Sequence, residues 1–151
     1  YAFSTEGVVG YSIGKKSSKM FLSAAKNSLI LSFTTGLLIS IFFLFLAKEI
    51  INLITDLEFL RFFTYKYLIW VIFIPPVASI AYQLDGIFIG ATQTAELRNA
   101  MIVSVTIYLF LSFFLTKQLH NYGIWFSLLL FMILRASTLH FYFSKILNKF
   151  K

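Results

Sequence analysis

Long apolar runs separated by short polar segments are the dominant pattern of this chain. Residues 27–47 and 99–116 carry no charge, and neither do residues 67–84. A membrane-spanning helix needs about 20 such residues. The segment from Lys48 to Lys66 is mixed and is interpreted as a helix end, a turn near Thr55–Asp56 and a new helix start, or as an amphipathic surface segment. The pattern predicts one partial helix and four full transmembrane helices, over residues 1–14, 27–47, 65–91, 99–116 and 123–143.

The composition supports a fold that has lipid as its solvent. Hydrophobic residues make up 59% of the 151 residues and charged residues 13%, too few to cover the surface of a soluble domain of this size. We therefore expect an all-α integral membrane region without a separate soluble domain. The chain has no cysteine, which excludes disulfides and thiolate sites. The net charge of +7 is attributed to membrane-flanking loops rather than to nucleic-acid binding.

The distribution of lysine and arginine predicts the orientation. Segments 15–26 and 92–98 and the tail from Lys145 to Lys151 hold eight basic residues, and the opposite segments hold four. Because the more basic side is normally cytoplasmic, the C-terminus is expected inside. The chain starts without an initiator Met or a signal peptide, inside an apparent helix. We expect it to be the C-terminal part of a longer protein.

Three ionisable residues lie within the apolar runs. Counting back from the predicted inner helix ends puts Glu6 and Arg135 about 12 Å, and Asp85 about 10 Å, above the inner boundary. Charges at one depth suit a paired, water-accessible site, although Glu6 is alternatively a surface residue. A proton or Na⁺ would supply the missing positive charge. Tyr82 shares the Asp85 face and is its expected neighbour, whereas Gln83 points largely away.

Prolines and glycines mark possible bends and contacts in these helices. The Pro75–Pro76 pair removes backbone donors and predicts a kink that serves as a hinge or lines a cavity, or is an ordinary membrane proline site. Two small-xxx-small pairs predict close helix packing; they are Gly10 with Gly14 and Gly86 with Gly90. His140 is interpreted as a polar residue at a helix interface rather than a proton relay.

Several motifs together resemble the MATE (multidrug and toxic compound extrusion) transporters, especially their bacterial DinF-like branch. They are Leu84-Asp85-Gly86-Ile87-Phe88-Ile89-Gly90-Ala91-Thr92, Arg98-Asn99-Ala100-Met101, Glu6-Gly7-Val8-Val9-Gly10 with Gly14, and Gly123-Ile124-Trp125 leading to Arg135. The resemblance implies a twelve-helix antiporter of two lobes, of which this chain forms most of the C-terminal lobe.

The same resemblance implies export of organic, often cationic, compounds in exchange for H⁺ or Na⁺, without a cofactor. Asp85 is similar in position to the acid of helix ten that binds the coupling cation in some members. Some DinF-like members instead use an acid in helix one, a helix absent from this chain. The substrate cavity would be shared with the missing N-terminal lobe.

Other functions fit the sequence less well. A lipid-linked saccharide or polyprenyl-phosphate flippase would favour a cavity rich in basic residues, and only Arg135 lies at depth. A non-transporting membrane scaffold would not need buried acids. The chain has no His-Glu-x-x-His, phosphate-binding or nucleophile-elbow motif, so we do not expect an enzyme.

Overall fold

The described chain is entirely helical. The computed structural model describes residues 1–150; Lys151 and the side chain of Lys149, both counted above in the basic tail, lie outside that description. Five α-helices and a terminal 3-10 turn account for nearly all of the described residues. They are α1 (Ala2–Gly14), α2 (Ser18–Ile54), α3 (Glu58–Gly90), α4 (Thr94–Leu119), α5 (Asn121–Leu147) and η1 (Asn148–Phe150).

The four long helices confirm the predicted integral membrane fold. Each of α2 to α5 is long and apolar enough to cross a bilayer. Each of these helices is longer than its predicted span, although α3 ends one residue before the predicted position 91. The reason is that an uncharged run marks the part in hydrocarbon, and a helix continues into the headgroup region. At about 1.5 Å per residue, α2 is roughly 55 Å long, against a hydrocarbon core of about 30 Å.

The basic segment between the first two helices is shorter than the loop predicted over residues 15–26. The connection ends at Ser17, whose hydroxyl accepts a hydrogen bond from the backbone N–H of Met20 at 3.3 Å and so caps α2. Lys19 and Lys26 therefore lie on α2 itself. Long lysine side chains permit this, because their ammonium groups reach the headgroups from a helical backbone.

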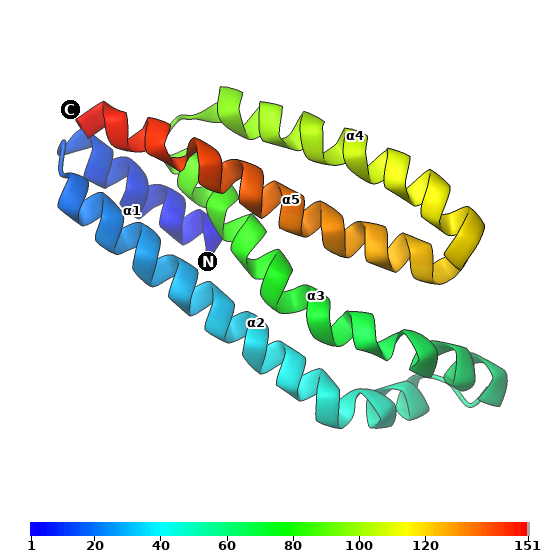
Figure 1. The fold of residues 1–151 in the computed structure, drawn as a ribbon. Coiled ribbons are helices and arrows are strands. Elements are labelled where there is room, and N and C mark those ends of the chain that lie inside the picture. Colours follow the sequence, from blue (N-terminus) through cyan, green and yellow to red (C-terminus); the bar gives the residue numbers. More distant parts are fainter. Residues whose placement is uncertain (151) are drawn as a thin grey trace.

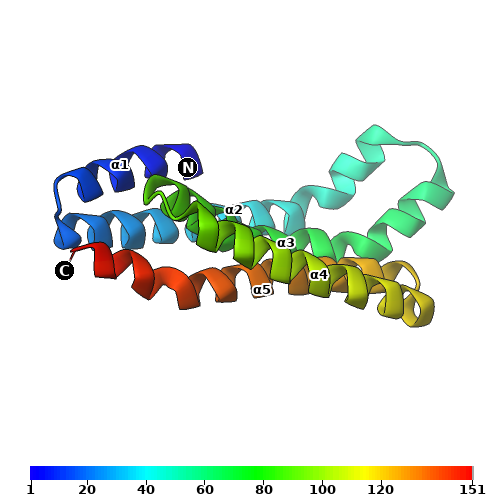
Figure 2. The same cartoon turned by 90° about the horizontal axis from the view of Figure 1, so that it is seen from above.

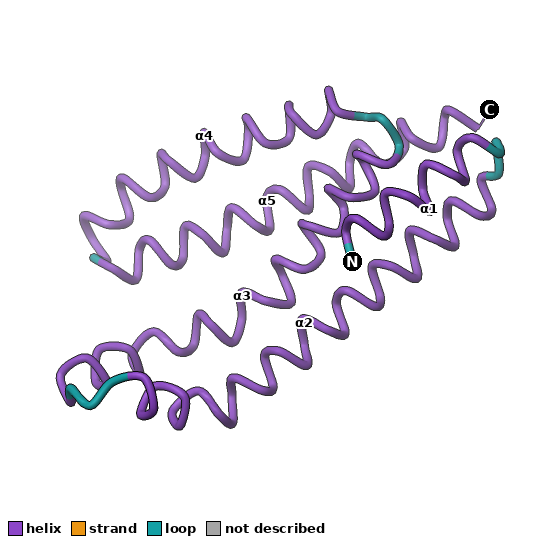
Figure 3. Tube along the Cα trace, turned by 180° about the vertical axis from the view of Figure 1, so that it is seen from behind, coloured by secondary structure: helices purple, strands orange, loops and turns teal. Residues whose placement is uncertain are grey.

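The long helices form two antiparallel hairpins, α2–α3 and α4–α5. Along the layer the order is α4, α5, α3 and α2, so that α3 lies between α2 and α5 (Figures 1 and 3). α1 packs against α3 and α2 from one side of this layer (Figure 2). The α1–α2 connection, the α3–α4 connection and the C-terminal end gather at one end of the bundle (Figure 1). We call this the basic end, because it unites the three segments that were counted as basic.

The main buried cluster lies toward the basic end, where α1 covers the layer. Its members come from all five α-helices. The cluster comprises Val9, Phe21, Ala25, Leu84, Ile87, Phe88, Ala91, Ala100, Leu139 and Ile146. Dense packing here holds α3 in a fixed position relative to α1 and α5. The functional side chains described below lie on these three helices.

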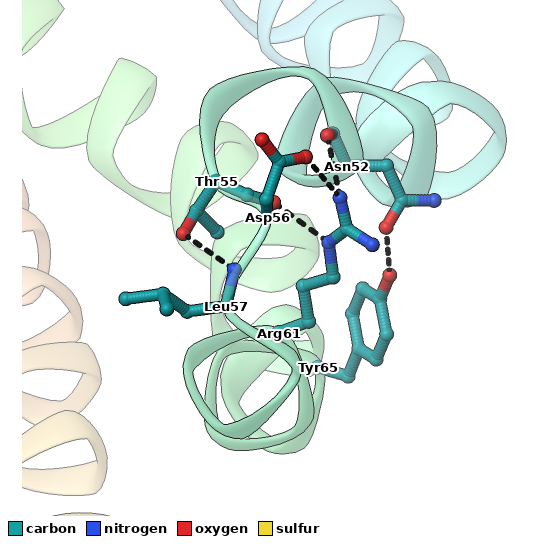
Figure 4. Close-up of polar contacts among 6 residues, drawn as sticks. All are labelled: Asn52, Thr55, Asp56, Leu57, Arg61 and Tyr65. Atoms are coloured by element: carbon teal, nitrogen blue, oxygen red, sulfur yellow. Dashed lines mark hydrogen bonds and ion pairs between the residues drawn. The ribbon is translucent and has the colours of Figure 1, made fainter.

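The turn between α2 and α3 falls at Thr55–Asp56, as predicted. Arg61 stabilises it through hydrogen bonds to residues of the turn and of the end of α2 (Figure 4). Arg61 Nε donates to the Thr55 carbonyl at 2.7 Å, and Nη2 donates to the Asn52 carbonyl at 2.9 Å. The hydroxyl of Tyr65 donates to Asn52 Oδ1 at 2.6 Å. The two arginine bonds satisfy backbone carbonyls that are left free at the C-terminal end of α2. The Arg61 ion pair with Asp56, at 3.2 Å, is solvent-exposed and adds little.

The α4–α5 connection is a single residue. His120 adopts a left-handed φ of 50° and lets the two helices turn back sharply. Gly123 then packs against the backbone of Leu115 so closely that an added Cβ would collide with it. A glycine at position 123 is therefore required for this close hairpin.

Helix α3 continues through the Pro75–Pro76 pair without a break. In a regular helix the carbonyl of Ile72 accepts from the N–H of residue 76, which proline lacks. The hydroxyl of Ser40 on α2 donates to that carbonyl at 2.6 Å instead. Gly36 permits the approach, since a Cβ there would lie 2.9 Å from the Pro75 carbonyl oxygen. Whether the pair acts as a hinge stays a prediction.

Candidate functional site

Asp85 and Arg135 form a two-point ion pair between α3 and α5. Arg135 Nε donates to Asp85 Oδ1 at 3.0 Å, and Nη2 donates to Oδ2 at 2.8 Å. The Asp85 side chain is 14% exposed and the Arg135 side chain is 11% exposed. The remaining terminal nitrogen, Nη1, contacts the sulfur of Met101 on α4. The pair thus connects three helices and neutralises the carboxylate within the apolar part of the bundle.

The parallel run of α3 and α5 explains why these residues meet. Both helices end at the basic end, so residues at similar distances from their ends lie at similar depth (Figure 1). A planar guanidinium that presents two donors matches the two oxygens of a carboxylate, which makes such pairs short and directional. Burial makes the pair sensitive as well, because removing either partner leaves a charge without compensation.

Glycines bring α1 against the same part of α3. A Cβ at Gly86 would lie 2.7 Å from the backbone oxygen of Ala2, and one at Gly90 would lie 2.6 Å from that of Glu6. The two helices therefore run in parallel at backbone contact. A hydrogen bond also joins the two helices: the Gln83 amide on α3 donates to the hydroxyl of Thr5 on α1. Gln83 is 1% exposed, so this bond satisfies a buried polar group.

The contact between α1 and α3 places Glu6 near the site but nearer to the basic end. Its backbone faces Gly90, five residues beyond Asp85, which corresponds to about 7.5 Å along the helix axis. Glu6 is partly buried. Among the described residues, its carboxylate has no hydrogen bond or ion pair within the usual distances. The structure brings Arg135 to Asp85, and it leaves Glu6 as a second acid about one and a half turns away.

Tyr82 lies on an open face of α3. Its side chain is 55% exposed, and no hydrogen bond links it to Asp85 among the described residues. The immediate neighbour of Asp85 is therefore Arg135. Tyr82 and the 42% exposed Ile89 mark the same side of α3, seven residues apart.

The remaining glycine positions differ from one another. A Cβ at Gly10 would meet the Gly90 carbonyl at an ordinary 3.5 Å, and one at Gly14 would meet no described atom within 4 Å. The tight contact with α1 is thus made by Gly86 and Gly90. No group of three or more His, Cys, Asp or Glu side chains that could hold a metal ion occurs within residues 1–150.

Sequence reasoning did not anticipate two of the contacts that hold the site. The Met101 contact with Arg135 depends on how α4 is rotated, which an uncharged run does not reveal. The Gln83–Thr5 bond had a partial signal, because two polar residues at similar depth within apolar helices need partners. The expectation that Gln83 points away from Asp85 agrees with this bond.

Comparisons with known proteins give a consistent result. The model of the family described as MatE matches residues 1–116. DNA damage-inducible protein F of Escherichia coli (strain K12) is 32% identical over 139 residues, which is 92% of this chain and 30% of that protein. The chain thus spans about 30% of the length of that relative. No solved structure matches the chain.

Proposed function

This chain belongs to the MatE family, whose members are transporters rather than enzymes, and we propose that it forms most of the C-terminal lobe of a cation-coupled exporter of organic compounds. The exporter exchanges its substrate for H⁺ or Na⁺ and needs no cofactor. An N-terminal lobe of the same protein completes the substrate cavity. The C-terminus faces the cytoplasm of a bacterial cell.

The observation that carries this proposal is the buried pair of Asp85 and Arg135. In the paired state the two side chains together carry no net charge, and both carboxylate oxygens accept from the guanidinium. A proton or a sodium ion that binds Asp85 competes with Arg135 for the same oxygens. The carboxylate therefore has two alternative partners, and each one stabilises a different arrangement of α3 relative to α5.

The surroundings of the pair suit this exchange. The open face of α3 presents Tyr82, whose aromatic ring attracts organic cations. Glu6 supplies a second acid about 7.5 Å closer to the basic end, where an ion released from Asp85 would pass. The contact of α1 with α3 at Gly90 keeps Glu6 at this depth. We infer that Asp85 binds the coupling ion and that Glu6 binds it in a second position on its path.

Transport by the full-length protein in proteoliposomes tests the proposal. Asp85→Asn keeps the size of the side chain and removes the charge, and it is expected to abolish efflux of a fluorescent organic cation driven by either a proton or a sodium gradient. Glu58→Gln, a matched change in the exposed first turn of α3, is expected to transport like the wild type.

A second variant serves as the control for loss of transport through misfolding. In Asp85→Asn with Arg135→Gln no unpaired charge remains, so the protein should elute from size exclusion as the wild type does and should still fail to couple. Undiminished gradient-driven efflux by Asp85→Asn would refute the proposed role of this residue. Comparison of the two gradients identifies the coupling ion.

A further inference from the structure

A groove runs between α2 and α5 on the side of α3 away from Tyr82. It consists of two hollows of about 390 and 360 Å³, and both are lined by Leu29, Leu84 and His140. α3 forms its floor through Ile80 and Leu84. Each of these two residues is two positions from Tyr82, or about 200° around the helix, which places them on the opposite face. We call this feature the α2–α5 groove.

The groove runs along the length of α2 and α5, the helices that form its walls. Its hollow nearer the basic end includes Lys26 and Phe143, and its deeper hollow includes Ile80 and Ala136. α2 leads away from the basic end and α5 leads toward it, so both helices place the deeper hollow farther into the membrane (Figure 1). The groove therefore has Lys26 at its entrance near the basic end. His140 lines both hollows, Ser137 lines the deeper one, and the other lining residues are apolar.

Lys26 fixes the depth of the entrance. It directly precedes the uncharged run 27–47, whose 21 residues match the thickness of the hydrocarbon core. The Lys26 side chain is exposed, and it lies at the boundary between hydrocarbon and headgroups. His140 adds an exposed imidazole on the opposite wall. No acidic residue lines either hollow among the residues that the structure describes.

We propose that the α2–α5 groove binds an anionic phospholipid of the leaflet at the basic end. The Lys26 ammonium and the His140 imidazole donate to the lipid phosphate, and an acyl chain lies along Leu29, Leu84 and Ala136. The lysine at the entrance, the absence of acidic residues among the described lining residues and the largely apolar lining all match this ligand. The site is independent of the coupling pair, because it lies on another face of α3.

Native mass spectrometry of the full-length protein in detergent tests the site. The probes are phosphatidylglycerol and phosphatidylcholine with the same acyl chains. The wild type is expected to retain phosphatidylglycerol preferentially. Lys26→Gln should weaken that binding about fivefold, which corresponds to about 1 kcal/mol for one basic residue at an anionic surface. Lys48→Gln removes the lysine at the other end of the same uncharged run, and it should leave binding unchanged.

A second variant fills the interior of the groove. Ala136→Phe is expected to abolish retention of phosphatidylglycerol while the elution profile stays that of the wild type. Equal retention of the two lipids by the wild type would overturn the proposal, as would unchanged binding in Lys26→Gln. Unchanged binding in Ala136→Phe would overturn it too, because the lipid would then bind outside the groove. Lys26 is exposed, so its replacement tests the site without a folding defect.

Discussion

Breaking the Asp85–Arg135 pair from one side should destabilise the protein strongly. Arg135→Gln removes the guanidinium and leaves a carboxylate that is only 14% exposed without its positive partner. Loss of one partner of a buried pair costs about 3–5 kcal/mol. Asp85→Asn leaves the guanidinium uncompensated and should cost a similar amount. The double variant retains no charge, and its two amides can bond to each other, so it should cost less than either single change.

The wild type, Asp85→Asn, Arg135→Gln and the double variant form a double-mutant cycle, in which the free energy of unfolding of each protein is compared. Equilibrium unfolding of the full-length protein in mixed detergent micelles provides the measurement. A coupling energy of about 3 kcal/mol or more is expected from the costs above. The Arg61–Asp56 pair is the control, since its aspartate is fully exposed and its cycle should give a coupling energy close to zero. Additive effects at Asp85 and Arg135, within about 0.5 kcal/mol, would refute the pairing.

Two further changes test the packing of α3 in the same unfolding assay. Gly90→Ala puts a Cβ 2.6 Å from a backbone oxygen of α1 and should destabilise by about 1–3 kcal/mol, whereas Gly14→Ala, which meets no described atom, should not destabilise. Ser40→Ala deprives the Ile72 carbonyl of its donor and should cost about 1–3 kcal/mol. In a Pro76→Ala background the helix supplies its own N–H, so the same change should cost clearly less; equal costs in both backgrounds would contradict this account.

The membrane spans could be predicted from the sequence because lipid imposes a simple rule on length and charge. That rule fixes where charges are tolerated, and it leaves the helix ends open. Lys26 was therefore assigned to a loop although it lies on α2. The turn at Thr55–Asp56 was found because polar residues gather there. Its closure by Arg61 was not found, since a side chain that bonds to carbonyls leaves no periodic signal.

The depth of the candidate site was predictable in part. Counting residues from the helix ends brought Glu6, Asp85 and Arg135 to one level. The structure joins Asp85 to Arg135 but places Glu6 about 7.5 Å nearer the basic end, against Gly90. Rotation about the helix axis is set by packing, which counting does not provide. For that reason Tyr82 was expected beside Asp85, whereas its side chain is largely exposed. The contact of Met101 with Arg135 depends on the same rotation.

The pairing of α3 with α5 has a consequence for how the protein is made. Ribosomes deliver α3 to the membrane before α5, so Asp85 arrives while Arg135 is still unsynthesised. A lone arginine or aspartate at the centre of a helix costs about 2.5–3.5 kcal/mol during insertion. We expect α3 to remain near the insertion machinery until the single-residue turn at His120 lets α4 and α5 enter together as a hairpin. Insertion of α3 then depends on α5, and truncation before α5 should lower the yield of inserted α3.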